Sequence, residues 1–358
     1  MKNELNLVAP FNTTSYGYVS CYVLSELKKL GCDIHSSPIH NVVAEQKFGP
    51  AISESINTPF FYNAPNLKVW HQHSLMSPVG RGPTFAFTFF ELDTFNDKER
   101  HSLGFPDHLF VCSEWARQVV LNNTSRKTEN THVVPLGIDP DIFKPYKSPI
   151  KDKTVFLNCG KWELRKGHDI LIEAFCRAFN SDDEVELLMM PHNFFLSEEQ
   201  TAEWRNYYTK NALGGKVRVL ERQNTQEEVY NIMRQAHCGV FPSRAEGWNL
   251  ELLEMMAIGK HVIATNNTAH TEYCDEENCL LIETPESEPA FDGVFFSGNG
   301  NWAALGDDQV NKLAEHMKEV HLKRKKGELG VNVAGIATGE SYTWVNTAKK
   351  IHGLIYGS

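Results

Sequence analysis

Hydrophobic and polar positions along this chain form short apolar runs that alternate with longer stretches of helical spacing. The apolar runs predict buried strands, at residues 5–9, 67–71, 84–89, 108–113, 154–158, 185–190, 216–220, 238–241 and 261–264. The helical spacing predicts helices over residues 18–30, 114–121, 168–179 and 249–258, and a charged helix from residue 307. A capping box of Thr225 and Glu228 predicts the start of another helix. Strands that alternate with helices indicate an α/β fold with parallel sheets of the doubly wound type.

A polar segment divides this pattern into two halves. Residues 144–153 contain four lysines and two prolines, which is typical of a solvated linker. A chain of 358 residues is long enough for two domains that each have their own core. We predict one Rossmann-like domain over residues 1–146, a second over residues 147–335 and a C-terminal helix within residues 336–358.

The composition argues against several classes of protein. A formal net charge of −10 disfavours broad attraction to nucleic acids or acidic membranes. No run reaches the roughly 18 apolar residues of a membrane span, and the start of the chain is expected to be a strand rather than a signal peptide. The eight cysteines are scattered without a C-x-x-C pair, which favours reduced thiols in a cytoplasmic protein.

The most informative stretch is residues 238–272. After its first strand comes a polar loop, and Asn249 and Gly259 are suited to begin and end the helix that follows. Glu246 lies in the loop and Glu254 within the helix. Open α/β sheets bind anions where a parallel strand leads through a loop into a helix. Two carboxylates there suit a ligand that also carries hydroxyls, because a carboxylate accepts hydrogen bonds from sugar hydroxyls in pairs. As an isolated pair, they would instead be interpreted as solvated charges.

The residues around these glutamates form a longer pattern, P-S-R-A-E-G-W-N-L-E-L-L-E-M-M-A-I-G-K-H-V-I-A-T. With its E-x7-E spacing, it resembles the donor-site signature of retaining glycosyltransferases of family 4. The resemblance implies a GT-B fold, in which two Rossmann-like domains face each other across a cleft and a C-terminal helix crosses back to the first domain. It also implies that Glu246 holds the transferred sugar and Glu254 the ribose hydroxyls. The backbone N–H groups that would point toward sugar and phosphate are those of Gly247, Trp248 and Asn249.

Two lysines precede the first helix of the second half. Lys161 and Lys166 flank the loop before the helix expected at residues 168–179, and most lysines in such loops are solvated. Lysines at a helix N-terminus oppose the helix dipole unless an anion lies between them. The loop is similar to the phosphate-binding loop of the family, with Lys161 in a place usually taken by arginine. The resemblance therefore implies that both lysines bind the donor diphosphate.

The candidates in the first half are less specific. Ser15 and Gly17 lie in the turn after the first strand, where the backbone could approach a phosphate or simply reverse direction. His71 and His73 end another strand and suggest a base, a metal ligand or side chains satisfied by backbone. The family often has a histidine in the loop after the next strand, but this chain has T-F-F-E there. Glu91 is our candidate for its replacement.

No metal site is expected. Asp139 and Asp141 are spaced as in a metal-binding D-x-D, but Asp139 before a proline is better explained as the cap of a helical turn. Glu272 matches a glutamate of the family, and we assign it a structural role.

These features predict a retaining hexosyl- or pentosyltransferase that uses a UDP- or GDP-sugar donor, without a metal or other cofactor. Its catalytic candidates are Glu246, Lys166 and Glu91. The expected acceptor is a hydroxyl of a saccharide or small glycoside, with a hydroxymethylated DNA base as a minority alternative, and no obligate protein partner is expected. A GT-B epimerase or phosphorylase and a non-catalytic nucleotide-sugar binder remain alternatives. An NAD-dependent enzyme is disfavoured because no G-x-G-x-x-G follows the first strand.

Overall fold

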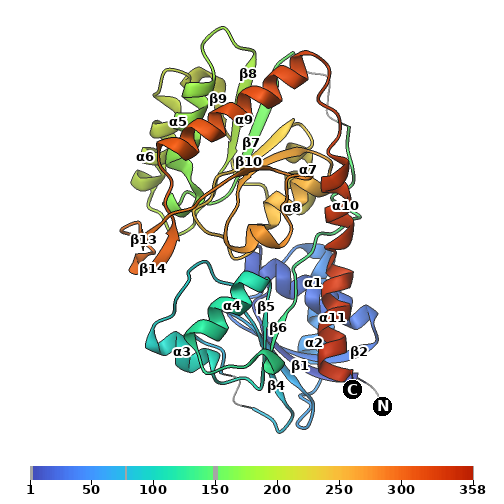
Figure 1. The fold of residues 1–358 in the computed structure, drawn as a ribbon. Helices are drawn as coiled ribbons and strands as arrows, with labels where there is room; N and C mark the ends of the chain where they lie inside the picture. The colour runs from blue at the N-terminus through green and yellow to red at the C-terminus, as the bar shows by residue number, and fades with distance from the viewer. Residues whose placement is uncertain (1–2, 77–78, 148–151, 358) are drawn as a thin grey trace. The chain divides into compact units, whose positions relative to one another are not determined.

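The computed structural model describes residues 3–76, 79–147 and 152–357. The chain forms two compact units, one made of residues 1–137 and 342–358 and the other of residues 138–341. Both are α/β units built around a six-stranded parallel sheet (Figure 1). The fold class predicted from the hydrophobic pattern is therefore confirmed.

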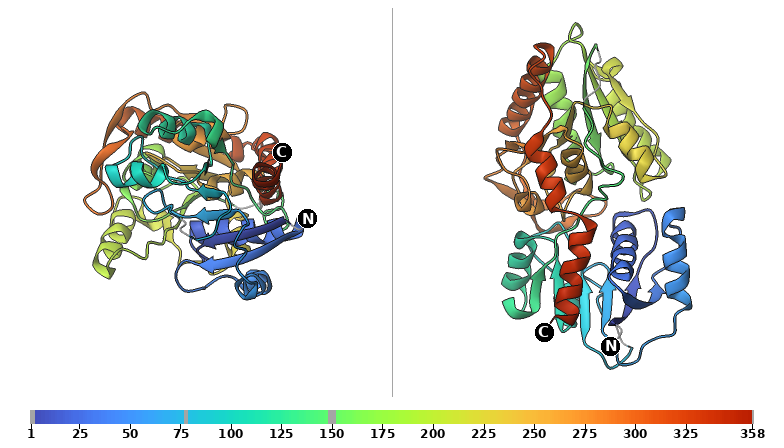
Figure 2. Two further views of the ribbon diagram at one scale, coloured as in Figure 1. Left: turned by 90° about the horizontal axis from the view of Figure 1, so that it is seen from below. Right: turned by 90° about the vertical axis from the view of Figure 1, so that its right-hand side faces the viewer.

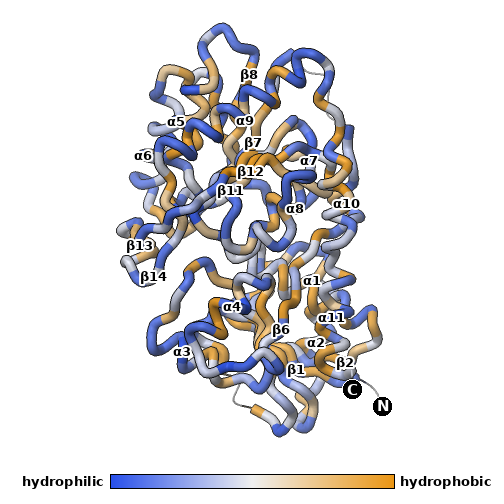
Figure 3. The backbone as a smooth tube through the Cα atoms, in the orientation of Figure 1, coloured by the Kyte–Doolittle hydropathy of each residue, from blue (hydrophilic) through white to orange (hydrophobic). Residues whose placement is uncertain are grey.

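In the first unit, the strand order is β2-β1-β3-β4-β5-β6, and all pairs are parallel. The elements are β1 (Asn3–Ala9), α1 (Ser15–Lys29), β2 (Cys32–Pro38), α2 (Gly49–Asn57), β3 (Asn66–Val69), β4 (Thr84–Phe87), α3 (Asp97–Leu103), β5 (His108–Val111), α4 (Glu114–Asn123) and β6 (Thr131–Val133). Parallel strands are buried on both faces, and in Figure 3 the apolar colour follows these strands. The carboxyl ends of β1, β3 and β4 consequently lie side by side at one edge of the sheet.

A helix from the C-terminal part of the chain completes the first unit. Helix α11 (Trp344–Tyr356) packs against α1 (Figure 2). The Trp344 ring stacks on Tyr22 with centroids 5.0 Å apart. The hydroxyl of Thr347 donates a hydrogen bond of 2.8 Å to the carbonyl of Pro135. Gly137 passes so close to Thr343 that a Cβ at this glycine would lie 2.2 Å from the Thr343 carbonyl carbon.

In the second unit, the strand order is β12-β11-β10-β7-β8-β9, again with parallel pairs. The elements are β7 (Thr154–Cys159), α5 (His168–Ala178), β8 (Val185–Met190), α6 (Glu198–Thr209), β9 (Val217–Val219), α7 (Gln226–Met233), β10 (Cys238–Phe241), α8 (Leu250–Ala257), β11 (His261–Thr265), β12 (Leu280–Ile282), β13 (Ser287–Phe291), β14 (Ser297–Ala303), α9 (Asp307–Lys325) and α10 (Val333–Ser341). Strands β13 and β14 form a separate antiparallel hairpin. The core lies between the sheet and helices α5 and α9, which pack against each other.

The chain divides at different residues from those expected. The first boundary falls after residue 137 rather than 146, because the segment that follows packs on the second unit, where the N–H of Tyr146 donates to the carbonyl of Ile258. The second falls after residue 341 rather than 335, because α10 packs against α8, with Gly339 close to Ala257. Residues 148–151 of the expected linker lie outside the described residues.

Candidate functional site

Two loops meet at the carboxyl edge of the second sheet. Strands β7 and β10 are neighbours, so the loops that follow them, residues 160–167 and 242–249, emerge side by side. The N–H of Arg244 donates to the carbonyl of Arg165 at 2.7 Å. At Gly167, where φ is +69°, an added Cβ would lie 1.9 Å from the carbonyl oxygen of Pro242. The close packing of the two loops therefore requires glycine at this position.

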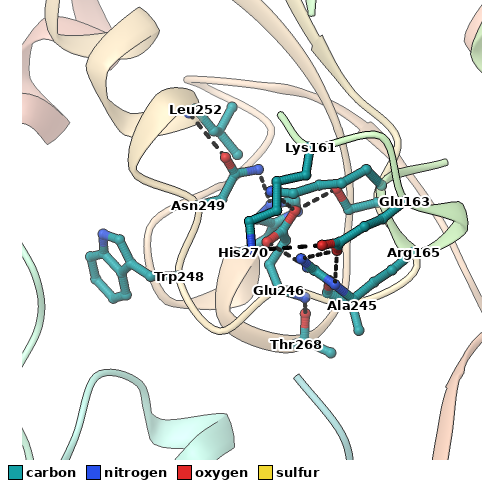
Figure 4. Close-up of polar contacts among 12 residues, drawn as sticks. Lys161, Glu163, Arg165, Ala245, Glu246, Trp248, Asn249, Leu252, Thr268 and His270 are labelled. Carbon is teal, nitrogen blue, oxygen red and sulfur yellow. Dashed lines mark hydrogen bonds and ion pairs between the residues drawn. The ribbon is translucent and has the colours of Figure 1, made fainter. Parts of the chain in front are cut away.

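The carboxylate of Glu246 is the centre of a buried ion-pair cluster (Figure 4). Lys166 Nζ lies 2.7 Å from its Oε1, and the Arg165 guanidinium lies 3.0 Å from its Oε2. The hydroxyl of Ser243 also donates to Oε1, at 2.6 Å. Burial opposes ionisation of Glu246, which is only 3% exposed, but the charges of Lys166 and Arg165 outweigh it and hold its pKa well below the usual range. Glu246 is therefore a carboxylate with both oxygens occupied.

Arg165 connects this carboxylate with a second one that the sequence analysis did not single out. Its guanidinium donates to Glu163 Oε2 at 2.8 Å and to the Ala245 carbonyl at 2.8 Å. Burial would raise the pKa of Glu163, but the charge of Arg165 lowers it. Arg165, Lys166, Glu163 and Glu246 are all buried, so their two positive and two negative charges compensate one another. Glu163, Arg165 and Lys166 are neighbours in one loop, and only folding brings Glu246 to them from the other loop, which is why sequence spacing gave no signal for Arg165 or Glu163.

Lys161 and Lys166 occupy different environments although they belong to one loop. The Lys161 side chain is 45% exposed, and its Nζ lies 3.7 Å from Glu163 Oε1. Lys166 is buried, which would lower its pKa, but the charge of Glu246 raises it overall. Lys166 is thus a fixed, charged group, and Lys161 is a cation at the surface of the same loop.

Asn249 begins helix α8 from an unusual backbone conformation. Its φ of 76° is left-handed, and its Oδ1 accepts from the N–H of Leu252 at 3.3 Å, as expected for an N-cap. Its Nδ2 lies 2.9 Å from His270 Nε2, and His270 Nδ1 lies 2.9 Å from the carbonyl of Thr265. Because an amide nitrogen donates and a carbonyl accepts, His270 carries its proton on Nδ1 and is neutral. Burial lowers the pKa of His270, which agrees with this assignment.

The other candidate residues near the β10 loop and α8 also belong to the second unit. Trp248 is buried beside Tyr273, whose hydroxyl donates a hydrogen bond of 2.7 Å to the Trp248 carbonyl. In Figure 4 the ring of Trp248 points away from the Glu246 cluster. Glu254 is buried within α8, five residues before Gly259, whose positive φ follows the end of this helix. Gly247 lies between Glu246 and Trp248 in the buried loop. Glu272 ends a short 3-10 turn after β11.

The candidates of the first half form a separate group in the first unit. The His71 ring packs 4.3 Å from Tyr16 and 5.5 Å from His73. The Tyr16 hydroxyl donates to the Phe89 carbonyl at 2.8 Å, and burial raises its pKa, with the nearby charge of Glu91 adding to this effect. These residues follow β1, β3 and β4, so the sheet edge gathers them as its topology predicts.

The glycine at the start of α1 has a structural explanation that does not involve a phosphate. An added Cβ at Gly17 would lie 2.2 Å from both the carbonyl oxygen and Oδ1 of Asn12. The chain's own Asn12 therefore explains this glycine without a ligand. Ser15 is the exposed first residue of the helix.

The described residues contain neither a cluster suited to a metal ion nor a helix suited to span a membrane. Within residues 3–76, 79–147 and 152–357, no group of three or more histidine, cysteine or acidic side chains is arranged to hold a metal ion. Asp139 instead accepts the N–H of Asp141 at 3.0 Å in a turn, although this turn does not become a helix. None of the helices in the same ranges has the length and apolar character needed to span a membrane.

Comparison with known proteins finds similarity to glycosyltransferases. A family model described as "Glycosyl transferases group 1" matches residues 141–295. Mannosylfructose-phosphate synthase of Agrobacterium fabrum is 24% identical over 61% of this chain and 50% of its own length, so the chain spans about half of that curated relative. The structure is similar to sucrose-phosphate synthase from Thermosynechococcus elongatus (TM-score 0.71, 15% identity, 98% of each chain). It is also similar to Anabaena HepE in complex with UDP and glucose (TM-score 0.73, 14% identity, 99% of this chain and 100% of that one). These solved structures show that the fold is GT-B.

A buried histidine at the start of α5 gives a pH-dependent prediction. His168 Nε2 lies 2.7 Å from the Lys161 carbonyl, and burial lowers the pKa of His168 to about 4. An unfolded histidine takes up its proton near pH 6.5, roughly, so between pH 6.5 and 4 the unfolded chain binds the extra proton. The free energy of unfolding should therefore fall as pH is lowered through this window, by up to about 1.4 kcal/mol per pH unit for this group.

Urea unfolding between these pH values checks this prediction. The variant His168→Gln should show a shallower dependence of unfolding free energy on pH than the unmodified protein. His101→Gln, which replaces an exposed histidine of α3, should leave the dependence unchanged. Equal slopes in all three proteins would mean that His168 is already protonated in the folded state.

Proposed function

We propose that this chain, whose residues 141–295 match the family model for glycosyl transferases group 1, transfers a sugar from a nucleotide-sugar donor to an acceptor hydroxyl. The observation that carries the proposal is the buried cluster of Glu246, Lys166 and Arg165, at the point where the loops after β7 and β10 meet. Fixed cations beside a fixed carboxylate suit a ligand that joins a diphosphate to a polyhydroxylated ring. Open α/β sheets bind ligands at this edge.

The diphosphate would be bound by Lys161, Lys166 and the N-terminal end of α5. An ammonium group has three N–H donors, so Lys166 can hold Glu246 and a phosphate oxygen at the same time. Lys161, at the exposed side of the loop, can move toward the ligand without leaving a buried charge unpaired. These cations would stabilise the negative charge that grows on the leaving diphosphate.

The sugar would be held by groups of the second loop. Glu246 would accept hydrogen bonds from hydroxyls of the transferred sugar, once the donor rearranges the contacts that now occupy both of its oxygens. Glu254 would bind the ribose, and the backbone N–H groups of Gly247, Trp248 and Asn249 would face sugar and phosphate. These roles are supported by the E-x7-E spacing and by the placement of the residues on one loop and helix.

The reaction would retain the configuration at the anomeric carbon. The bond between this carbon and the diphosphate oxygen breaks, and the acceptor oxygen bonds to the same face of the sugar. The acceptor proton passes to the departing phosphate, so neither a protein base nor a metal ion is required. Binding both reactants in this geometry would supply much of the acceleration. The resemblance of the donor loops to retaining family 4 enzymes supports this course.

The first unit would bind the acceptor. Its aromatic and polar group around Tyr16, His71, His73 and Glu91 lies at the carboxyl edge of its sheet. Aromatic faces and hydroxyl-binding groups suit a saccharide or a small glycoside, while a hydroxymethylated DNA base is the less favoured acceptor. Glu91 would contact the transferred sugar in place of the histidine of the family.

A donor screen tests the proposal. UDP- and GDP-sugars are added singly, and the unfolding temperature and the release of nucleoside diphosphate are measured with and without mono- and disaccharide acceptors, in EDTA. We expect one donor to raise the unfolding temperature and to be consumed faster with an acceptor, and proton NMR of the product should show the anomeric configuration of the donor. UDP-sugars come first, because HepE, which has the same fold, was solved with UDP and glucose.

Each of the other outcomes would indicate a different function. Epimerised sugar without an acceptor would indicate an epimerase, and binding without turnover or hydrolysis would indicate a binding protein. If no nucleotide sugar changes the unfolding temperature, the proposed function is wrong.

A further inference from the structure

A cavity lies in the second unit, beside the β7 loop. It has a volume of about 390 Å³ and is formed by the β7 loop, helix α6 and the turn of the β13–β14 hairpin. Its lining includes Trp162, Glu163, Trp204, Tyr207, Asp292 and Phe295. Lys166, Glu246 and Glu254 are not part of the lining. Cavities of this size hold small organic ligands, so its chemistry is informative.

The cavity has aromatic walls from three separate segments. Trp162, which is buried, stacks on Trp204 with centroids 5.7 Å apart and planes 2° from parallel. This packing fixes the orientation of Trp204 on α6, and Tyr207, one turn later, is 48% exposed. From the hairpin, Phe295 remains 41% exposed although it lies in a turn. Large aromatic side chains that are held in place yet left in contact with solvent are typical of binding surfaces.

Apart from Gln200, the polar residues of the lining are acidic. Asp292 Oδ1 accepts the N–H groups of Val294, Phe295 and Phe296 at 2.7 to 2.9 Å, which fixes the hairpin turn. Within residues 152–357, neither Asp292 nor Glu203 forms an ion pair, so both remain acceptors at the cavity. Carboxylates beside aromatic rings provide paired acceptors for hydroxyls together with flat apolar faces for the carbon-bound hydrogens of a sugar ring.

We propose that this cavity binds one sugar ring of a neutral saccharide, at a subsite that shares the β7 loop with the donor site but is not lined by Lys166, Glu246 or Glu254. Glu163 connects the two places, because it lines the cavity and also accepts from Arg165, which holds Glu246. The saccharide would be a remote portion of the acceptor or product, and only this identification rests on the proposed glycosyltransferase function. The binding of a saccharide does not depend on it.

Other ligand classes fit less well. The carboxylates of Glu203 and Asp292 would repel a phosphate, so the cavity does not suit a nucleotide. An anionic membrane surface is disfavoured by the same charges, although Phe291, Val294 and Phe295 are exposed on the hairpin. A ligand ammonium group would be attracted to the carboxylates. However, the Trp162 and Trp204 rings stack on each other, so they do not form an aromatic cage around a cation.

Titration calorimetry with the full chain tests the proposal. The probes are tetrasaccharides of glucose, mannose and galactose, with glucosamine as an ammonium probe and phosphatidylcholine–phosphatidylglycerol vesicles as a membrane probe. We expect at least one tetrasaccharide to bind with a dissociation constant of the order of millimolar. Phe295→Ala and Glu203→Gln should each weaken it by about fivefold or more.

Matched controls lie on the same two elements. Phe291→Ala changes an exposed phenylalanine of the hairpin outside the cavity, and Glu199→Gln an exposed glutamate of α6. Both should bind the tetrasaccharide within about twofold of the unmodified protein. All four variants should retain the unfolding temperature of the unmodified protein.

The proposal is overturned if no tetrasaccharide binds, or if the cavity and control variants bind equally. Binding of glucosamine alone would make the cavity a cation site, and vesicle binding that Phe295→Ala abolishes would make it a membrane contact. The donor screen is independent of these measurements. Saccharide binding without any donor binding would therefore refute the proposed function and leave the cavity assignment standing.

Discussion

Replacing Lys166 by alanine is expected to lower kcat/KM of the proposed transferase by about 10²-fold or more. A fixed charge directed at a developing anion is worth this much when it acts in a water-poor site. Lys166 is buried and held 2.7 Å from Glu246, so it needs no reorganisation when the diphosphate departs. Initial rates at varied donor concentration measure the effect, and the loss should appear mainly in kcat.

Lys161→Ala is the matched control for Lys166→Ala. Its side chain belongs to the same loop but is 45% exposed, so solvent screens its charge and the loss should be nearer tenfold. Circular dichroism and the unfolding temperature must show that both variants are folded, because removing Lys166 leaves Glu246 with Arg165 as its remaining cation. Unchanged turnover in a folded Lys166→Ala protein would contradict the assigned role.

The substitution Gly167→Ala is expected to lower the free energy of unfolding by about 3 kcal/mol or more, or to prevent folding of the second unit. Two effects add. A non-glycine residue at φ +69° is strained, and the added Cβ would lie 1.9 Å from the carbonyl oxygen of Pro242. Relieving the overlap requires the two loops to separate, which would also displace the Glu246 cluster. Denaturant unfolding measures the change.

Gly327→Ala separates the two effects. Gly327 follows α9 with a φ of +71°, but an added Cβ there would have no atom within 4 Å. Only the backbone strain applies, so the loss should be about 1 kcal/mol. If Gly167→Ala costs no more than Gly327→Ala, the two loops are not as tightly packed as the structure shows.

Local signals in the sequence predicted the elements that carry the site. The strands at Val185–Met190 and Cys238–Phe241 have the predicted bounds, and the capping box of Thr225 and Glu228 is present. Asn249 caps α8, and Gly259 has a φ of +78° after it. Capping and left-handed positions depend on residues only a few places apart, so they are visible in a single sequence.

Long-range pairing could not be predicted in the same way. The sequence analysis expected Glu246 to face a sugar, and the structure shows both of its oxygens paired within the protein. Arg165 was not singled out, because its partner Glu246 belongs to the other loop, 81 residues further along the chain. The β13–β14 hairpin was missed for a related reason, since its glycine- and asparagine-rich second strand has little apolar alternation.

The return of α11 to the first unit has a consequence for biosynthesis. A ribosome produces residues 1–137 well before residues 342–357. The surface of α1 that contacts Trp344 is therefore not covered by α11 until the entire second unit has been translated. During this interval the ring of Tyr22 lacks its stacking partner from α11, and the early intermediate carries an apolar face toward solvent. A nascent chain stalled before residue 342 should therefore engage chaperones that a full-length chain releases.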